Sequence, residues 1–188
     1  MAVGEGSGTT SGDAAVPGRA NEKSTPESKE RGAEASGRLL VVANAPSENT
    51  RLLREAILDG ARDEAVEGIA VTCREPLEAG PEDVLACDAI VLGTTANFGY
   101  MSGALKDFLE RTYHPCLERT QGLPWALYIR GGSDGDGARD SVTRIVTGLR
   151  WKAVRPPTML VGEWREEFVG QARELGLLMA ASLEAGVI

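Results

Sequence analysis

Apolar residues along this chain form short continuous runs, and these runs alternate with stretches in which apolar residues recur at helical spacing. The first run, 38–44 (Arg-Leu-Leu-Val-Val-Ala-Asn), is typical of a strand buried on both faces in the centre of a parallel sheet. Over 50–61 the apolar residues lie on one stripe of a helix. The same reasoning predicts strands at 68–73, 88–93, 124–129 and 158–161, and helices at 81–86, 101–112, 138–149 and 166–183. Strands that alternate with helices in this way predict a parallel α/β sheet covered on both faces.

Residues 1–37 differ in composition from the rest of the chain. They are rich in Gly, Ser, Thr, Glu, Lys and Pro, they include no aromatic residue, and their only large apolar residues are Met1, Val3 and Val16. Such a segment cannot bury enough surface to offset the entropy of ordering. We therefore expect a disordered tail over 1–37, acting either as a passive extension or as a partner-docking arm, and one folded domain over 38–188.

Charge and cysteine content exclude several classes of function. The 188 residues carry a net charge of −8, so the chain has no electrostatic reason to bind nucleic acid or an anionic membrane. No apolar signal-peptide core begins the chain, and no stretch is apolar enough to span a bilayer. Three widely spaced cysteines (Cys73, Cys87 and Cys116) and one histidine provide neither a disulfide framework nor a set of zinc ligands. The expectation is a cytoplasmic protein with reduced thiols and no metal.

The loop after the first strand, 44–50, joins a buried strand directly to a helix. In parallel sheets, ligands bind outside the carboxyl ends of the strands. Small and hydroxylic residues, together with the free amides of the helix start, form a concavity suited to an anion, and Ser47, Asn49 and Thr50 can add side-chain donors. Ordinary helix capping by Ser47 or Asn49 explains the same residues. The loop alone leaves both interpretations open.

Two further loops follow neighbouring strands. Residues 93–103 combine small residues with Phe98 and Tyr100, which can either cradle a flat ring or merely cover the end of the sheet. Residues 130–137 contain four glycines, which let the backbone approach a ligand closely. Asp134 and Asp136 suggest calcium, but Ala138 stands where the next ligand is needed.

Other catalytic arrangements are not supported. The Walker and dinucleotide-binding glycine patterns are absent, and Ser102 lies one position too late for a nucleophile elbow. We expect His114 just beyond a helix on the surface, and Cys116 in a structural position rather than as a reactive thiol. No side chain is therefore assigned a catalytic role.

One long segment resembles a known superfamily. The run Gly93-Thr-Thr-Ala-Asn-Phe-Gly-Tyr-Met-Ser-Gly-Ala-Leu-Lys106-Asp-Phe-Leu-Glu-Arg-Thr112 is similar to Gly-Thr-Pro-x-x-x-Gly-x-Met-x-Gly-x-x-Lys-x-Phe-x-Asp-Arg of the flavodoxin-like superfamily, in particular of the NADPH-dependent FMN reductases. Thr95 replaces the usual proline and Glu110 the usual aspartate. The resemblance covers roughly 38–184 in element order. It implies a three-layer, doubly wound sandwich with a five-stranded parallel sheet of order 2-1-3-4-5.

The resemblance also implies a site for FMN. The first loop would bind the phosphate, residues 94–100 would line the isoalloxazine ring, and residues 131–137 would border its other edge. The positions assigned to the cofactor in this way are Pro46, Ser47, Glu48, Asn49, Thr50, Thr94, Thr95, Ala96, Asn97, Phe98, Gly99, Tyr100, Gly131, Gly132, Asp134 and Gly137. Pro46 and Glu48 depart from the Thr/Ser-rich loop with glycine that long-chain flavodoxins carry.

By the same resemblance, the chain is expected to be an NAD(P)H-dependent oxidoreductase in which FMN carries the chemistry and passes electrons to a quinone, a flavin or another small acceptor. Two alternatives remain: a flavodoxin-type electron carrier that serves a redox protein, and a flavin-free interaction module. Related reductases often form homodimers, although no distinct interface patch stands out in this sequence.

Overall fold

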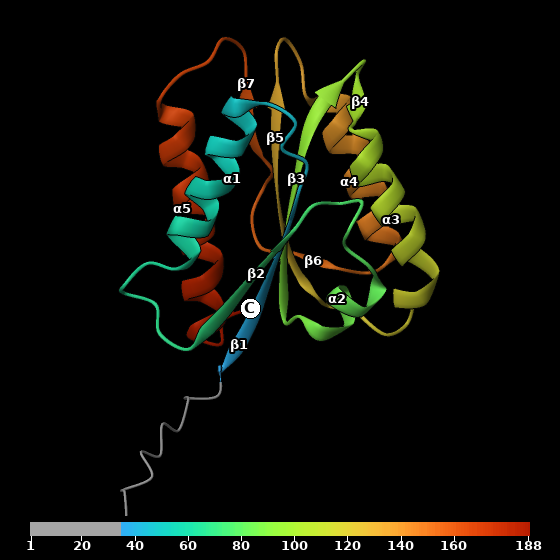
Figure 1. Cartoon of the computed structure of the whole chain (residues 1–188). Helices are drawn as coiled ribbons and strands as arrows, with labels where there is room; N and C mark the ends of the chain where they lie inside the picture. Colours follow the sequence, from blue (N-terminus) through green and yellow to red (C-terminus); the bar gives the residue numbers. More distant parts are fainter. Residues whose placement is uncertain (1–34) are drawn as a thin grey trace, which may run out of the picture. The chain divides into compact units, whose positions relative to one another are not determined.

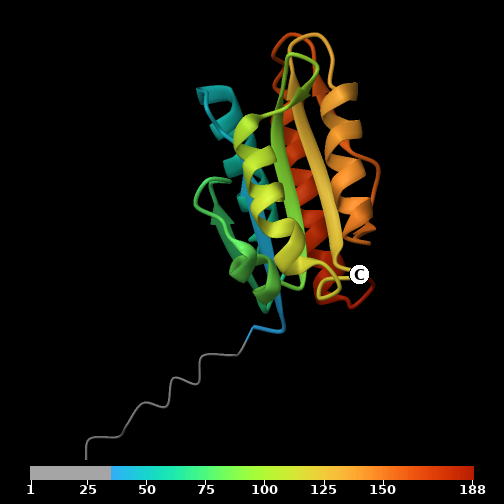
Figure 2. The same cartoon turned by 90° about the vertical axis from the view of Figure 1, so that its right-hand side faces the viewer.

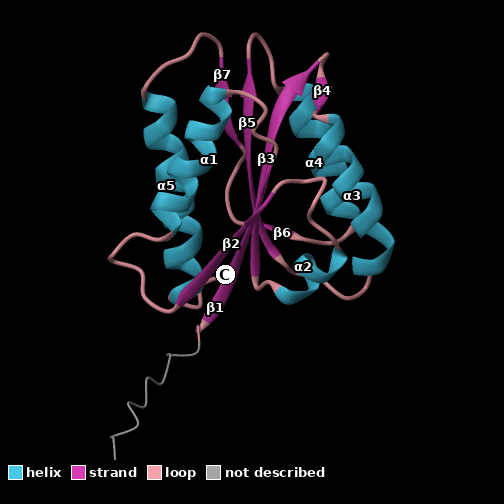
Figure 3. Cartoon of the chain, viewed as in Figure 1, coloured by secondary structure: helices cyan, strands magenta, loops and turns pink. Residues whose placement is uncertain are grey.

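The computed structural model describes residues 35–188 (Figure 3). The strands are β1 Gly37–Ala43, β2 Ile69–Arg74, β3 Ala89–Asn97, β4 Tyr100–Met101, β5 Pro124–Gly131, β6 Lys152–Ala153 and β7 Thr158–Val161. The helices are α1 Glu48–Ala61, α2 Pro81–Ala86, α3 Gly103–Cys116, α4 Asp136–Gly148 and α5 Glu167–Glu184. This order of strands and helices reproduces the predicted alternation.

Positions 1–34 of the predicted tail, which spans 1–37, lie outside the residues that the structure describes. Its last residue, Gly37, belongs to β1, so the predicted boundary at residue 38 was slightly too late. The reason is a pair of backbone hydrogen bonds, in which Ser36 and Gly37 both donate to the carbonyl of Gly68, at 2.7 and 3.4 Å. These bonds extend the pairing of β1 beyond its apolar run.

Five parallel strands make up the body of the sheet, in the order β2-β1-β3-β5-β7. This is the order expected for the flavodoxin-like fold. Two strands of two residues each were not predicted: β4 pairs antiparallel with the end of β3, and β6 pairs with the start of β5. Pro156 and Pro157 separate β6 from β7, because proline has no backbone N–H to donate along the edge of the sheet.

Helices cover both faces of the sheet, with α1 and α5 on one side and α2, α3 and α4 on the other (Figures 1 and 2). Alternate residues of β1 supply the two cores. Leu39 and Val41 pack under α1 and α5, whereas Leu40 and Val42 pack under the opposite helices. Burial of a central strand on both faces explains the continuous apolar run in the sequence.

The helix α3 is longer than the sequence predicted. It continues past Thr112 to Cys116, so the placement of His114 just beyond a helix was wrong. Cys116 is fully buried in the core, and the N–H of Leu117 donates to the carbonyl of Tyr113 at 2.9 Å. Core packing therefore keeps the last turn helical although Pro115 supplies no donor.

The helices α1 and α5 approach each other closely through two glycines. A Cβ on Gly176 would overlap the carbonyl of Ile57, and a Cβ on Gly60 would overlap the carbonyl of Arg173. The absence of these side chains lets the two backbones touch. This contact fixes the position of α1, whose first turn begins the candidate site.

We expect Gly176→Ala to lower the free energy of unfolding by about 1–3 kcal/mol, because the added methyl group must push α5 away from the backbone of α1. Urea denaturation of the purified protein measures this change. Gly170→Ala, on the same helix, is the matched control. No atom lies within 4 Å of its added Cβ, so a gain of about 0.5–1 kcal/mol is expected. Equal losses in both variants would contradict the close-contact interpretation.

Candidate functional site

The carboxyl ends of β1, β3 and β5 meet at one edge of the sheet, and the segments that follow them are joined to one another (Figure 1). The side-chain amide of Asn44, directly after β1, donates to the hydroxyl of Thr95 in β3 at 3.3 Å. A Cβ on Gly131, at the end of β5, would lie 3.3 Å from the methyl group of Ala96. The three predicted site segments are therefore brought together by the fold.

Ser47 and Thr50 form the N-terminal cap of α1. The Ser47 hydroxyl accepts a hydrogen bond from the N–H of Thr50 at 3.3 Å. The Thr50 hydroxyl accepts from the N–H of Ser47 at 2.8 Å and donates to the carbonyl of the same residue at 2.9 Å. Only 4% of Thr50 is exposed. Both hydroxyls therefore stabilise the helix start, which was the capping alternative that the sequence left open.

Other donors remain at this helix end. The N–H groups of Glu48 and Asn49, the first two residues of α1, have no acceptor within the helix. Together with the helix dipole they favour an anion, and the half-buried Asn49 can add its side-chain amide. The carboxylate of Glu48 lies in the same turn and is exposed, and Pro46 has no N–H to offer.

The segment after β3 is a hairpin and not the loop that the sequence predicted. β3 continues to Asn97, the chain turns at Phe98 and Gly99, and Tyr100 pairs back on Asn97. Both turn residues have positive φ angles, 51° and 71°, as in the two-residue turns that best fit the twist of a hairpin. Asn-Gly is the usual sequence for such a turn, so Phe98-Gly99 gives little indication of it.

Phe98 is the most unusual residue of the hairpin. It holds a backbone conformation that costs free energy in a residue with a bulky side chain, and its side chain is fully exposed. Neither packing nor turn preference accounts for an aromatic ring at this position. Strained and exposed residues of this kind cluster at ligand sites, so Phe98 is the strongest candidate for contact with a flat ring.

Thr94 has a structural role in this arrangement. It is 1% exposed, and its hydroxyl accepts a hydrogen bond from the N–H of Ser102 at 2.9 Å. The Ser102 hydroxyl in turn accepts from the N–H of Leu105 at 3.2 Å and caps α3. Thr94 therefore connects β3 to the start of α3 from within the core.

The third segment is shorter than predicted, because β5 continues to Gly131 and α4 begins at Asp136. The Asp134 carboxylate accepts a hydrogen bond at 2.8 Å from the N–H of Asp136, the first residue of α4, and so stabilises the start of this helix. Gly132 and Asp134 are exposed at the turn. Gly137, in contrast, packs against the hairpin, where a Cβ would overlap the carbonyl of Gly99.

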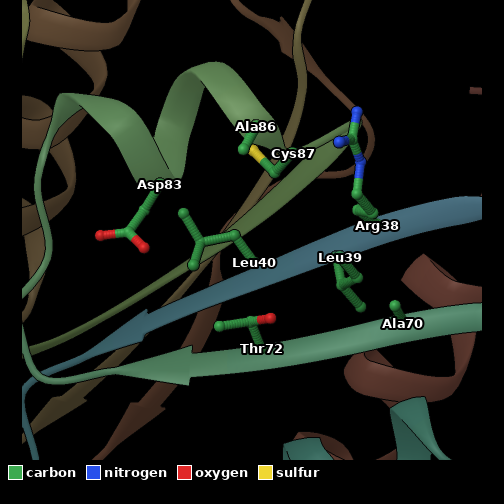
Figure 4. Close-up of a pocket in the computed structure, with 8 residues that line it drawn as sticks. All are labelled: Arg38, Leu39, Leu40, Ala70, Thr72, Asp83, Ala86 and Cys87. Carbon is green, nitrogen blue, oxygen red and sulfur yellow. The ribbon is translucent and has the colours of Figure 1, made fainter.

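Several cavities open on the surface of residues 35–188, and two of them differ in their distance from the candidate site. One of about 150 Å³ is formed by β1, β2 and α2 and includes Arg38, Thr72 and Cys87 (Figure 4). It lies toward the amino ends of β1 and β2, away from the candidate site. Another, of about 230 Å³, lies between the hairpin and α4. Gly99, Tyr100 and Gly137 line it, together with α4 residues that were not predicted from the sequence.

The thiols are protonated at neutral pH. Burial, with Asp88 nearby, raises the pKa of Cys87 to about 12, and burial also raises the pKa of Cys73 and of Cys116. None of the three is activated as a nucleophile. Within residues 35–188, no three His, Cys, Asp or Glu side chains are placed to hold a metal ion, and no helix is long and apolar enough to cross a bilayer.

The donor set at this edge of the sheet fits FMN, with fewer side-chain donors than the sequence suggested. Backbone amides and Asn49 at the start of α1 suit a phosphate. Phe98 offers a ring face, and an added Cβ at Gly132 meets no atom within 4 Å, so the backbone there is open to a ligand. These groups come from the first, second and third segments respectively.

Known proteins are similar to this chain in sequence and in fold. No family model matches the chain. Flavodoxin of Aquifex aeolicus is 28% identical over 113 residues, covering 60% of this chain and 60% of that protein. An NAD(P)H dehydrogenase (quinone) of Archaeoglobus fulgidus is 32% identical over 104 residues, covering 44% and 54%. The chain thus aligns with less than two thirds of the length of these two relatives.

A solved flavodoxin from the domain Archaea superposes with a TM-score of 0.67 at 18% identity, over 78% of this chain and 98% of that one. Taken with the sequence relatives, this similarity shows that residues 35–188 have the flavodoxin-like fold.

Proposed function

We propose that the chain binds FMN and is an oxidoreductase that takes electrons from NAD(P)H and passes them to a quinone or another small acceptor. The observation that carries this proposal is one juxtaposition. The first-turn amides of α1 lie at the same sheet edge as the strained, exposed ring of Phe98, and the Asn44–Thr95 hydrogen bond joins the two segments. A phosphate and a flat ring on one ligand match these two features.

The phosphate would be held mainly by neutral donors, namely the N–H groups of Glu48 and Asn49 and the side-chain amide of Asn49. Ser47 and Thr50 would position these donors, because the hydrogen bonds between them hold the first turn of α1 in place. The Glu48 carboxylate would have to point away from the phosphate, which its exposed position allows.

The ring would lie near Asn97 and Phe98 on one side and Gly132 and Asp134 on the other. FMN, when bound, supplies hydride acceptance and electron transfer to an acceptor, and no protein acid or base is required for these steps. The role of the chain would be to position the ring. The three thiols are protonated, and none of them is assigned a role.

The decisive experiment follows NAD(P)H oxidation by the purified protein after FMN has been added. Steady oxidation that depends on added quinone supports the proposal. Tight flavin binding without such turnover, together with electron exchange with a redox protein, supports the carrier alternative, which the net charge of −8 and the flavodoxin relative favour. Protein that stays colourless after incubation with FMN and gel filtration overturns both.

We predict that Asn49→Ala weakens FMN binding about tenfold, because one hydrogen-bond donor to a charged phosphate is lost. A fluorescence titration of FMN measures the dissociation constant, and the free energy of unfolding should hardly change. Thr50→Ala provides the contrast. It removes a capping side chain, so it should lower the unfolding free energy by about 1 kcal/mol. Unchanged affinity in Asn49→Ala would exclude Asn49 as a phosphate ligand.

A substitution at Gly137 tests whether the packing of the hairpin turn on α4 matters for the site. We predict that Gly137→Ala lowers both FMN affinity and turnover at least several-fold, because the new methyl group displaces the Gly99 carbonyl and with it Phe98. Titration with FMN and steady-state kinetics report the two effects. Gly103→Ala, beside the same hairpin, is the control, since its added Cβ meets no atom within 4 Å. If the two variants behave alike, the position of the hairpin is not important for the site.

A further inference from the structure

The cavity of about 230 Å³ beside the hairpin has walls from two elements. Gly99 and Tyr100 form one side, and α4 forms the other with Asp140, Ser141, Arg144 and Ile145. At the base of the cavity, Gly137 allows the hairpin turn to rest directly on the α4 backbone. The cavity therefore begins at Gly99, the residue next to Phe98.

The cavity contains a cation that is free to bind a ligand. Arg144 is exposed, and it forms no ion pair among the described residues. Other cations nearby are already neutralised, because Arg139 pairs with Asp136 and Asp140, and Lys106 pairs with Glu110. Asp140 shares Arg139 with Asp136, so its carboxylate is only partly compensated. Arg144 is the cation of the cavity wall that has no ion pair among the described residues.

The remaining wall groups suit a ring with polar substituents. Tyr100 is 45% exposed and presents a phenol ring. The hydroxyl of Ser141 donates to the carbonyl of Ala138 at 2.9 Å, so its oxygen can still accept a hydrogen bond from a ligand. A guanidinium group beside an aromatic ring is well suited to a phosphate attached to a flat base.

We propose that this cavity binds the phosphate-bearing nucleotide arm of the electron donor, with Arg144 as the residue that holds the anion. The inference rests on the proposed function for the place of the flavin. A dinucleotide carries a pyrophosphate, which a guanidinium group binds through charge-assisted hydrogen bonds, whereas a neutral quinone offers Arg144 no charge to bind. The volume is below the roughly 300–1,000 Å³ of complete ligand pockets, so the cavity holds part of the donor only.

The kinetic test compares Arg144→Gln with the wild-type protein, both loaded with FMN. The KM for NAD(P)H should rise about tenfold or more, because a charge-assisted hydrogen bond is lost. The kcat and the KM for an uncharged naphthoquinone should stay the same. Arg119→Gln is the control for the change in charge, since Arg119 is an exposed residue near the amino end of β5. A KM for NAD(P)H that is unchanged in Arg144→Gln overturns the proposal.

A second set of kinetic measurements tests whether the cavity binds the electron donor or an anionic electron acceptor. If Arg144→Gln raises the KM for a sulfonated naphthoquinone and leaves that for NAD(P)H unchanged, the cavity serves the acceptor and the donor assignment is wrong. If the KM for NAD(P)H rises and that for the sulfonated quinone does not, the assignment to the donor is supported.

A binding measurement separates this inference from the proposed function. ADP-ribose, which carries the pyrophosphate arm without a nicotinamide, should bind the full chain in the absence of FMN, as measured by calorimetry. Arg144→Gln should lose most of this affinity, and Arg119→Gln should keep it. Binding that depends on Arg144 supports the cavity even if the protein fails to bind FMN. If the protein binds FMN and oxidises NAD(P)H, but Arg144→Gln does not change the affinity for ADP-ribose, the assignment of the cavity is wrong and the proposed function stands.

Discussion

Parallel pairing of β1, β3 and β5 in one register is the constraint on which the site depends. Ala43 pairs with Gly93, and Gly93 pairs with Tyr128, so the three strands end at the same edge of the sheet. Gly93 leaves room for the buried ring of Tyr128, and a Cβ at this position would overlap that ring. A larger residue at position 93 would force β3 and β5 apart. The segments that carry Asn49, Phe98 and Gly132 would then no longer lie together.

The sequence predicted the fold well because the fold depends on periodicity. Continuous apolar runs marked the five long strands, and helical spacing marked the helices between them. Errors arose where tertiary contacts decide a boundary. Buried Cys116 extends α3 past Pro115, and the hydrogen bonds to Gly68 extend β1 back to Gly37. Neither contact could be inferred from local sequence, since the partners come from other elements.

The site was predicted less completely than the fold. Its three segments lie at one edge of the sheet, as the rule that ligands bind at the carboxyl ends of parallel strands led us to expect. The roles within them were harder to predict, because hydroxyl groups that can bind phosphate are also good caps. The structure uses Ser47 and Thr50 as caps, places Thr94 in the core and packs Gly137 against the hairpin. The hairpin itself was missed because Phe98-Gly99 lacks the usual turn residues.

The anionic ligands proposed for this edge would have to bind to an acidic chain. At physiological salt, charges more than about 8 Å apart in solvent are largely screened, so most of the carboxylates that give the net charge of −8 act only weakly here. What matters is the first turn of α1, where the amides and the helix dipole act within hydrogen-bonding distance. Glu48 lies in this turn, and its carboxylate is the charge that opposes a phosphate most directly. Affinity for a phosphate at this edge therefore depends more on the orientation of Glu48 than on the overall acidity of the protein.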